Sequence, residues 1–494
     1  MQPYFCKRII SVAEKYAIIV ALCFLVVPYS SFADDAVMVP KMPEVVKKLA
    51  SASKEISSRT IIKAANLKEY STIILPELKS LIERSGFEIQ AASKLRYRWR
   101  YDDLWEKTSD TPLADDLLLK DGSLKELVPM KRGYLFGDWQ QLLQQQQEDL
   151  GQKARKIMWN IESVRWSQPY SEAEFRLVRN KKENKIAEFS GSLTRVYTRA
   201  VNPADRSIQL FREKLSFQTP AVLNGLSFLT LRFFGPDEDM LWEYSPAIKK
   251  VRQLTGSNRT DPLVGSYVSL DDLFVWSGKQ EQIKVSGDLK LQSLLSPFYT
   301  LDMTRAIKDQ ANKGCVIINI KEGQESPISE ATSSLFYDEK TTIQPSSVLM
   351  ADAATFVPRF LWRVSLLSRD PYSLYGRQVL YVDVYSMLPV LKVVYDRAGR
   401  LWKLVAGFAG LALDIDSKIR FPFYSDIFVY DFQKHDSSLM SFRNFRYCSR
   451  LPQNVSLESL TPTGLAPQVA QHQEEPNPIN DNFAQNGDGN NTNL

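Results

Sequence analysis

The chain has 494 residues, of which 44% are hydrophobic, and it carries a formal net charge of +5. This weak charge comes without an arginine-rich stripe, which argues against a nucleic-acid partner. The two histidines cannot form a multi-His metal site, and no nucleophile elbow, phosphate-binding glycine loop or Cys-x-x-Cys motif is present, so we expect no metal, no cofactor and no catalytic residues.

Residues 1–33 have the features of a secretory signal peptide. Lys7 and Arg8 make the start basic, and residues 17–27 form an apolar stretch too short for a stable helix across a bilayer of about 30 Å. Small residues before the acidic start of the mature chain fit cleavage near Ala33. We therefore predict export to a Gram-negative periplasm; the alternative is an uncleaved N-terminal anchor.

The remaining chain divides into three predicted regions. Residues 34–130 are expected to be mainly helical, because apolar side chains such as Val45 and Leu49 recur near helical spacing. The apolar period then changes towards 2, which predicts a β-rich domain over residues 131–459. Residues 460–494 are rich in Pro, Gln, Asn and Asp, and we predict a disordered tail because they cannot bury enough apolar surface to offset the entropy of ordering.

Short apolar runs in the β-rich region predict antiparallel strands joined by tight turns, at residues 226–234, 360–367, 379–385, 390–395, 401–406 and 427–432. Asp396-Arg397-Ala398-Gly399 is a predicted hairpin turn, since Gly399 is free to adopt positive φ. Residues 289–301 are interpreted instead as a partly helical excursion.

A curved antiparallel sheet that does not close exposes a concave apolar face, and such a face can hold an acyl chain. Single-face sets of apolar residues are the candidate ligand-binding residues: Leu229, Leu231, Phe233, Met240, Trp242, Tyr244, Trp362, Val364, Leu366, Leu380, Val382 and Val384. The alternative is that these sets pack against helices as ordinary core.

A group of cations follows the Trp-Glu-Tyr-Ser-Pro strand. Lys249, Lys250 and Arg252 come directly after it, and Arg259 follows soon afterwards. Such cations can contact a lipid headgroup or an acidic partner protein. A solvated turn is the simpler interpretation.

Removal of the leader would leave two cysteines, Cys315 and Cys448. An even pair in an oxidising compartment is compatible with a disulfide. The alternative is two buried free thiols, because the sequence does not show whether the two residues meet.

A few acidic residues are the only candidates for catalysis, and the case for them is weak. Asp271, Asp272 and Asp383 are the carboxylates that an enzyme acting on envelope lipids or glycans would use. Exposed turn acids are the simpler interpretation of such residues.

Two long stretches resemble a bacterial periplasmic family, the domain-of-unknown-function family 1329. The first stretch is Trp242 to Arg252, followed by Gly265-Ser266 and Asp271-Asp272. The second is Tyr375 to Asp383, which continues through Tyr395 to Trp402. Further landmarks occur in the order of the family at Arg132 to Gly137, Trp159-Asn160, Tyr430-Asp431 and His435.

The resemblance implies a fold similar to LolA and LolB, which is β-rich α+β: a half-open antiparallel β-barrel with helices covering its mouth. It also implies a carrier of lipid or another hydrophobic molecule, working beside exporters and outer-membrane proteins. We therefore predict a non-enzymatic periplasmic carrier or accessory protein in outer-membrane transport or homeostasis. The alternatives are a periplasmic scaffold that docks on an inner-membrane exporter or outer-membrane protein, and the envelope enzyme.

Overall fold

A computed structural model of the full chain describes residues 41, 43–44, 60–125, 133–145, 148–164, 168–181, 184–201, 209–234, 239–273, 283–320 and 355–466. The predicted signal peptide and its cleavage near Ala33 lie outside the described residues. No helix in the described ranges is both long and apolar enough to cross a membrane.

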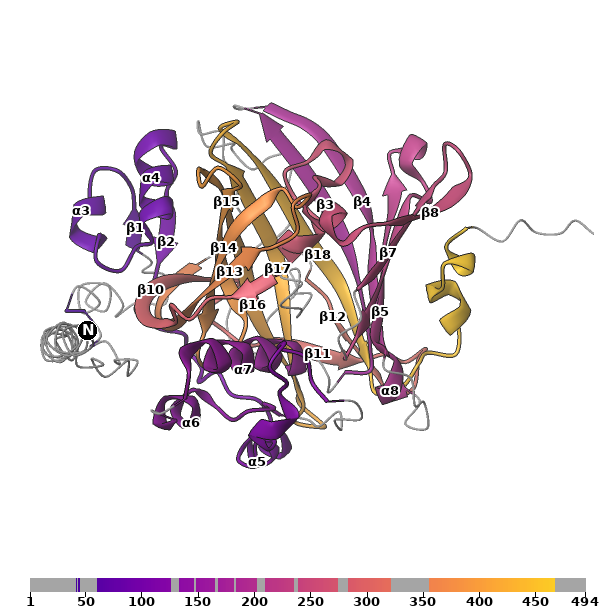
Figure 1. Ribbon diagram of the computed structural model, residues 1–494, viewed down its shortest axis with the longest axis horizontal. Coiled ribbons are helices and arrows are strands. Elements are labelled where there is room, and N and C mark those ends of the chain that lie inside the picture. Colours follow the sequence, from indigo (N-terminus) through magenta and orange to yellow (C-terminus); the bar gives the residue numbers. More distant parts are fainter. Residues whose placement is uncertain are drawn as a thin grey trace, which may run out of the picture.

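Two antiparallel meanders make up most of the sheet (Figure 1). The first consists of β3 (Tyr170–Lys181), β4 (Asn184–Tyr197), β5 (Gln209–Thr219), β6 (Ser227–Phe233), β7 (Met240–Ser245) and β8 (Lys250–Leu254). The second consists of β13 (Thr355–Ser368), β14 (Tyr375–Asp383), β15 (Pro389–Asp396), β16 (Leu401–Asp414), β17 (Arg420–Asp431) and β18 (Asp436–Cys448). Because β18 pairs with β3, the meanders join into one curved sheet.

Burial along the strands explains their sequence patterns. β5 alternates between buried and half-buried positions along much of its length, as a strand with one better-covered face does. β17 is buried at every residue after its first, which requires cover on both faces and gives a nearly continuous apolar run. The predicted hairpin turn joins β15 to β16, and Gly399 has a φ of 76° there.

Shorter strands complete the sheet: β1 (Thr60–Ile62), β2 (Ile89–Ala91), β9 (Ile283–Val285), β10 (Lys290–Phe298), β11 (Thr304–Lys308) and β12 (Cys315–Ile318). The interpretation of residues 289–301 as partly helical is wrong. β10 pairs with β13 along its whole length, and this long-range pairing decides its conformation. β11 lies parallel to the end of β16, while β12 pairs with β18.

Cys315 and Cys448 face each other across β12 and β18 and form a disulfide. Their Cα atoms are 4.0 Å apart, although 133 residues separate them in sequence. The sequence left open whether these two cysteines pair, and the structure shows that they do.

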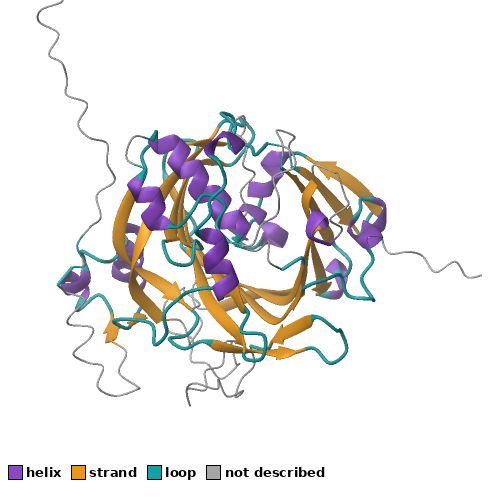
Figure 2. Ribbon diagram, turned by 90° about the horizontal axis from the view of Figure 1, so that it is seen from below, coloured by secondary structure: helices purple, strands orange, loops and turns teal. Residues whose placement is uncertain are grey.

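The helices are short, apart from two. They are α3 (Leu67–Tyr70), α4 (Pro76–Ser85), α5 (Asp103–Ser109), α6 (Trp139–Gln144), α7 (Leu150–Ser163) and α8 (Thr198–Val201). Figure 2 shows helices gathered in the curve of the sheet. α7 begins at an Asp149 cap and is buried at ten of its fourteen positions, as a helix enclosed by other elements must be. The predicted β-rich fold, a half-open antiparallel barrel with helices over its mouth, is confirmed.

Turns of 3-10 helix connect several elements: η1 (Asp115–Leu117), η2 (Ala221–Leu223), η3 (Gly256–Thr260), η4 (Leu263–Gly265), η5 (Leu270–Leu273), η6 (Leu457–Leu460) and η7 (Thr463–Leu465). The last two contradict the predicted start of the disordered tail, because Leu460 and Leu465 are buried in a small core cluster. Residues 467–494 lie outside the described residues.

Candidate functional site

An apolar cavity lies between the two meanders. It holds about 790 Å³ of empty space, counted out to the solvent at its mouth. One wall comes from β3, β4 and β5, and the other from β17 and β18. Its apolar lining includes Ala173, Leu193, Leu273, Phe423, Ile427, Phe442, Phe445 and Tyr447.

Aromatic packing shapes one wall of the cavity. The Phe423 and Phe445 ring centroids are 5.3 Å apart, and those of Phe445 and Tyr447 are 6.2 Å apart. Alternation along β18 places Phe445 and Tyr447 on the same face, because residues two apart in a strand share a face. The wall therefore presents rigid apolar surface to a ligand.

The opposite wall contains an ion pair. Arg195 lies against Glu213, with its Nε 2.7 Å from a Glu213 carboxylate oxygen, and both residues are buried. Burial disfavours the charged guanidinium, but Glu213, Tyr197 and Glu162 together outweigh burial, so the pKa of Arg195 is raised. The cavity thus has an apolar wall and a charged but paired wall.

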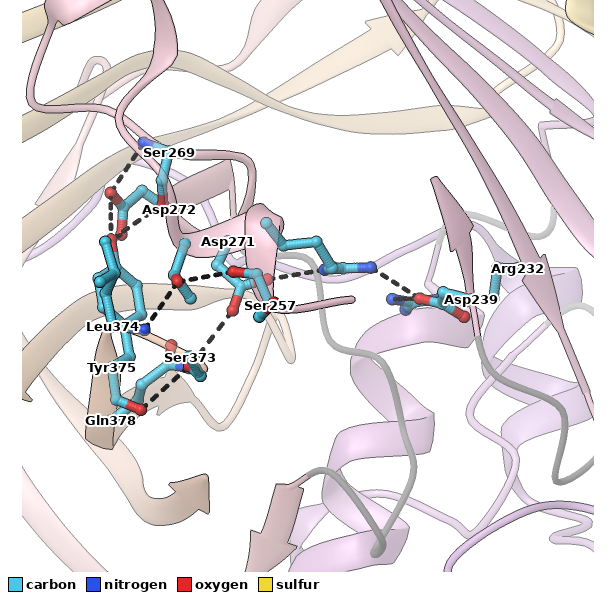
Figure 3. Close-up of polar contacts among 12 residues, drawn as sticks. Arg232, Asp239, Ser257, Ser269, Asp271, Asp272, Ser373, Leu374, Tyr375 and Gln378 are labelled. Carbon is cyan, nitrogen blue, oxygen red and sulfur yellow. Dashed lines mark hydrogen bonds and ion pairs between the residues drawn. The ribbon is translucent and has the colours of Figure 1, made fainter. Parts of the chain in front are cut away.

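This ion pair is one end of a network of buried charges that extends into the protein. Glu162 of α7 lies 4.0 Å from Arg195 and 3.4 Å from Arg232. Arg232 in turn contacts Asp239 at 2.8 Å. Arg259 then joins Asp239, at 2.7 Å, to Asp271. Figure 3 shows this part of the network, which runs from Arg232 and Asp239 towards Asp271.

The network of buried charges ends at a cluster around Asp272. Its carboxylate lies 3.2 Å from the Nζ atoms of both Lys392 and Lys403. It also accepts a hydrogen bond from the Tyr375 hydroxyl at 2.9 Å. Burial alone would raise the pKa of Asp272, but Lys403 and Lys392 outweigh burial and lower this pKa to about 2.

Within this network the positive and negative charges are equal in number. The five cations are Arg195, Arg232, Arg259, Lys392 and Lys403, and the five anions are Glu162, Glu213, Asp239, Asp271 and Asp272. Pairing of this kind is what allows charges to remain in a core. Because its members come from α7, from both meanders and from the segment 239–273, the network ties that inner segment to both walls of the half-barrel.

The candidate enzymatic carboxylates are all held by cations. Asp271 contacts Arg259, Asp272 contacts two lysines, and the Asp383 carboxylate binds Arg359 through both oxygens, at 2.7 and 2.9 Å. They are buried rather than exposed turn acids, so that simpler interpretation is wrong. In the described parts of the chain, no three His, Cys, Asp or Glu side chains gather in a way that could hold a metal ion.

The twelve candidate ligand-binding residues separate into two groups, and none of them is among the residues lining the cavity. One group is brought together within the main core, on β13, on β14 and at the residue after β14: Trp362, Val364, Leu366, Leu380, Val382 and Val384. Ligand binding at these positions stays a prediction.

The other group lies on β6 and β7. Leu229 and Tyr244 are buried with Leu460 and Leu465 in the small core cluster, and the partly buried Leu231 and Trp242 pack against it, whereas Phe233 is half-buried and Met240 is exposed.

The small cluster lies on the outer face of the sheet. Leu229 of β6 pairs with Lys214 of β5, so these two side chains lie on the same face of the sheet. Glu213, the residue before Lys214 on β5, lines the cavity. Because neighbouring residues in a strand point to opposite faces, Leu229 faces away from the cavity. The period of 2 identified the apolar face of β6, but the C-terminal segment covers it.

The four candidate headgroup or partner contacts do not form one group. Lys249, Lys250 and Arg252 are exposed on the hairpin of β7 and β8, and Arg252 pairs with Glu243 there. Arg259 is buried between Asp239 and Asp271. Its inclusion with the exposed cations is corrected, because both carboxylates occupy its guanidinium inside the fold.

The fold and cavity define a class of protein: a half-open antiparallel barrel that surrounds helices and an apolar pocket. A family model described as a protein of unknown function, DUF1329, matches residues 61–448. The chain belongs to this family. No curated protein matches it.

Solved structures with a similar fold share little sequence with the chain. A domain from Vibrio parahaemolyticus described as an outer-membrane lipoprotein-sorting protein is 14% identical, covers 63% of this chain and 97% of its own, and has a TM-score of 0.39. A DUF1329 protein from Desulfovibrio piger is 16% identical, with 64% and 100% covered and a TM-score of 0.40. A LolA superfamily protein from Nitrosomonas europaea is 13% identical, with 62% and 97% covered and a TM-score of 0.32.

Proposed function

We propose that the protein is a periplasmic carrier or accessory protein that binds a lipid or other hydrophobic ligand in the cavity between the two meanders. The cavity carries this proposal, because its aromatic wall offers apolar surface within the curve of the sheet. Each methylene of an acyl chain buried there would contribute roughly 0.8 kcal/mol.

Two observations support the compartment. The sequence predicts a cleavable leader, and Cys315 forms a disulfide with Cys448. Disulfides persist in oxidising compartments such as the bacterial periplasm. The role in outer-membrane transport or homeostasis is part of the same proposal.

Ligand binding is tested with the neutral fluorophore N-phenyl-1-naphthylamine and matched variants. Leu193→Trp adds bulk inside the cavity, and Leu231→Trp makes the same change on the outer face; both leucines are half-buried on strands. We expect Leu193→Trp to weaken binding at least tenfold and Leu231→Trp to leave it unchanged. Equal binding by both variants would contradict a ligand in this cavity.

The cargo is identified by native mass spectrometry of protein purified gently from the periplasm, followed by organic extraction. A stoichiometric acyl-chain ligand in the wild type that is lost in Leu193→Trp supports the carrier. An apo mass that stays unchanged after incubation with envelope lipids contradicts it.

A docking role on an exporter or outer-membrane protein is the second candidate. The hairpin of β7 and β8 carries exposed Ile248 beside Lys249 and Lys250, and among the described residues β8 pairs only with β7. An apolar side chain flanked by cations suits a partner with an acidic rim. Crosslinking from position 248 in cells tests this candidate, and recovery of no envelope protein would count against it.

A further inference from the structure

A second pocket lies apart from the apolar cavity and shares no lining residue with it. It holds about 560 Å³ of empty space, counted out to the solvent at its mouth. The segment after β2 forms one side, and the start of β13 with Tyr385 forms the other. Every charged residue that lines it is a cation: Lys94, Arg98 and Arg359.

Two of these cations are unengaged. Lys94 and Arg98 are exposed, and neither makes a hydrogen bond or ion pair with another described residue. An unpaired exposed cation is common on a protein surface. Two of them beside a third at one concave site concentrate positive potential there.

Arg359 is fixed in position. Its Nε and Nη2 atoms bind the Asp383 carboxylate, at 2.7 and 2.9 Å. Its guanidinium lies 4.4 Å from the ring centroid of Tyr385 and 5.4 Å from that of Phe298. No hydrogen-bond partner among the described residues is found for Nη1, so this nitrogen keeps donors for a ligand.

Two neutral donors in the same lining also lack partners. The Tyr97 hydroxyl and the Trp99 Nε1 atom are buried, and neither has a hydrogen-bond partner in the described structure. Solvent reaches neither atom, so these two donors are not counted among the groups that a ligand in the open pocket would contact.

Charge and donors together define the ligand. The three cations and Asp383 leave a net charge of +2 around the pocket, and the unpaired groups are all donors. A phosphoryl group has matching properties, since it carries close to two negative charges as a monoester and its oxygens accept hydrogen bonds. A carboxylate offers one charge and fewer acceptor positions.

We propose that the pocket formed by residues 94–99 and 357–359 binds a phosphoryl group through its three cations, Lys94, Arg98 and Arg359. This site is independent of the apolar ligand proposed above. The phosphoryl group is either free in solution or the headgroup of a phospholipid, and both have the chemistry that the pocket recognises.

Calorimetric titration of the full mature protein distinguishes these sources. Inorganic phosphate represents the free anion, and dihexanoyl phosphatidic acid below its micelle concentration represents the headgroup. Saturable binding of phosphate supports the site. Binding of the lipid alone assigns the site to a headgroup only if Arg98→Gln weakens that binding, since the apolar cavity could otherwise hold the acyl chains. Binding of neither at low salt overturns the proposal, as does binding of acetate with the same affinity as phosphate.

Matched variants locate the binding. Arg98→Gln should weaken it at least about tenfold, the usual effect of losing one hydrogen bond to a charged group. Arg369→Gln is the control, because Arg369 is exposed and absent from the pocket lining. Equal affinities of Arg98→Gln and Arg369→Gln would place the anion elsewhere and overturn the proposal.

Failure here is separable from failure of the carrier proposal. Arg98→Gln should leave binding of N-phenyl-1-naphthylamine unchanged, because Arg98 does not line the apolar cavity. Leu193→Trp should in turn leave phosphate binding unchanged, because Leu193 does not line the second pocket.

Discussion

The Tyr375 hydroxyl donates a hydrogen bond to the Asp272 carboxylate at 2.9 Å, across 103 residues of sequence. The same hydroxyl accepts one from Lys403 Nζ at 2.7 Å. The contact joins the inner segment 239–273 to the wall of the second meander. Both family-like stretches of the sequence therefore meet at one buried polar cluster.

Replacing Asp272 with Asn should destabilise the fold strongly. It would leave the ammonium groups of Lys392 and Lys403 buried without their carboxylate. Removing one partner of a buried ion pair typically costs about 3–5 kcal/mol. Urea unfolding at pH 7 measures this change. Tyr375→Phe, which removes only a hydrogen bond, should cost about 1–3 kcal/mol.

The matched control is Asp416→Asn. Asp416 pairs with Lys308 at 2.8 Å, but both side chains are well exposed. Solvent screens such a pair, so the urea midpoint should stay close to that of the wild type. Equal effects of Asp416→Asn and Asp272→Asn would show that burial of the network does not matter.

Stability should depend on pH through Asp426. Burial raises the pKa of its carboxyl from 3.8 to about 6, although the hydroxyls of Ser441 and Ser425 oppose the shift. The raised pKa means that the native state favours the protonated form. The protein should therefore lose stability as the pH rises from about 4 to 6, by about 3 kcal/mol, and change little above that from this group.

Asp426→Asn removes this dependence, since the amide does not ionise. The gain in unfolding free energy over the wild type should grow between pH 4 and 6 and then stay constant. Urea unfolding of both proteins at a series of pH values provides the measurement. Parallel pH curves would exclude Asp426 as the source.

Removing the C-terminal segment that covers the outer face should destabilise the sheet. A chain that ends at Arg450 loses η6 and η7 and exposes Leu229, Leu231 and Trp242. Lower thermal stability and stronger binding of an apolar dye such as ANS are expected. A chain that ends at Ala466 keeps Leu460 and Leu465 and should match the wild type. Similar behaviour of the two truncations would disprove a covering role.

Replacing Cys315 and Cys448 together with Ser should lower stability by about 2–5 kcal/mol, the usual range for losing a native disulfide. Dithiothreitol should lower wild-type stability similarly and leave the double variant unaffected. A thiol assay on the unreduced mature protein, unfolded in denaturant, should find no free cysteine. Two titratable thiols would instead support the free-thiol alternative.

Much of the β-rich architecture could be predicted because its signals are local. The turn at Gly399 and the apolar runs around it predict β15 and β16, and both strands form as expected. The sequence did not predict β10 because its conformation depends on pairing with β13, whose partner residues lie 57 to 73 positions later in the chain. Local pattern does not contain that information.

The candidate site could be predicted only in part, for the same reason. A period of 2 shows that β6 has an apolar face, but not whether that face lines a cavity or lies under the C-terminal segment. Phe445 and Tyr447, which line the cavity, were missed although they alternate along β18. Their spacing was the signal that could have identified them.

The amino-acid sequence alone was enough to predict the family, the β-rich class, five of the six strands of the second meander and the candidate cysteine pair, because ordered motifs, periodicity and composition are properties of the chain alone. Only the tertiary structure decided that Arg259 is buried, that Cys315 meets Cys448, and that Asp272 meets Tyr375 and two lysines. Such contacts depend on distances between residues remote in sequence, and folding alone sets those distances.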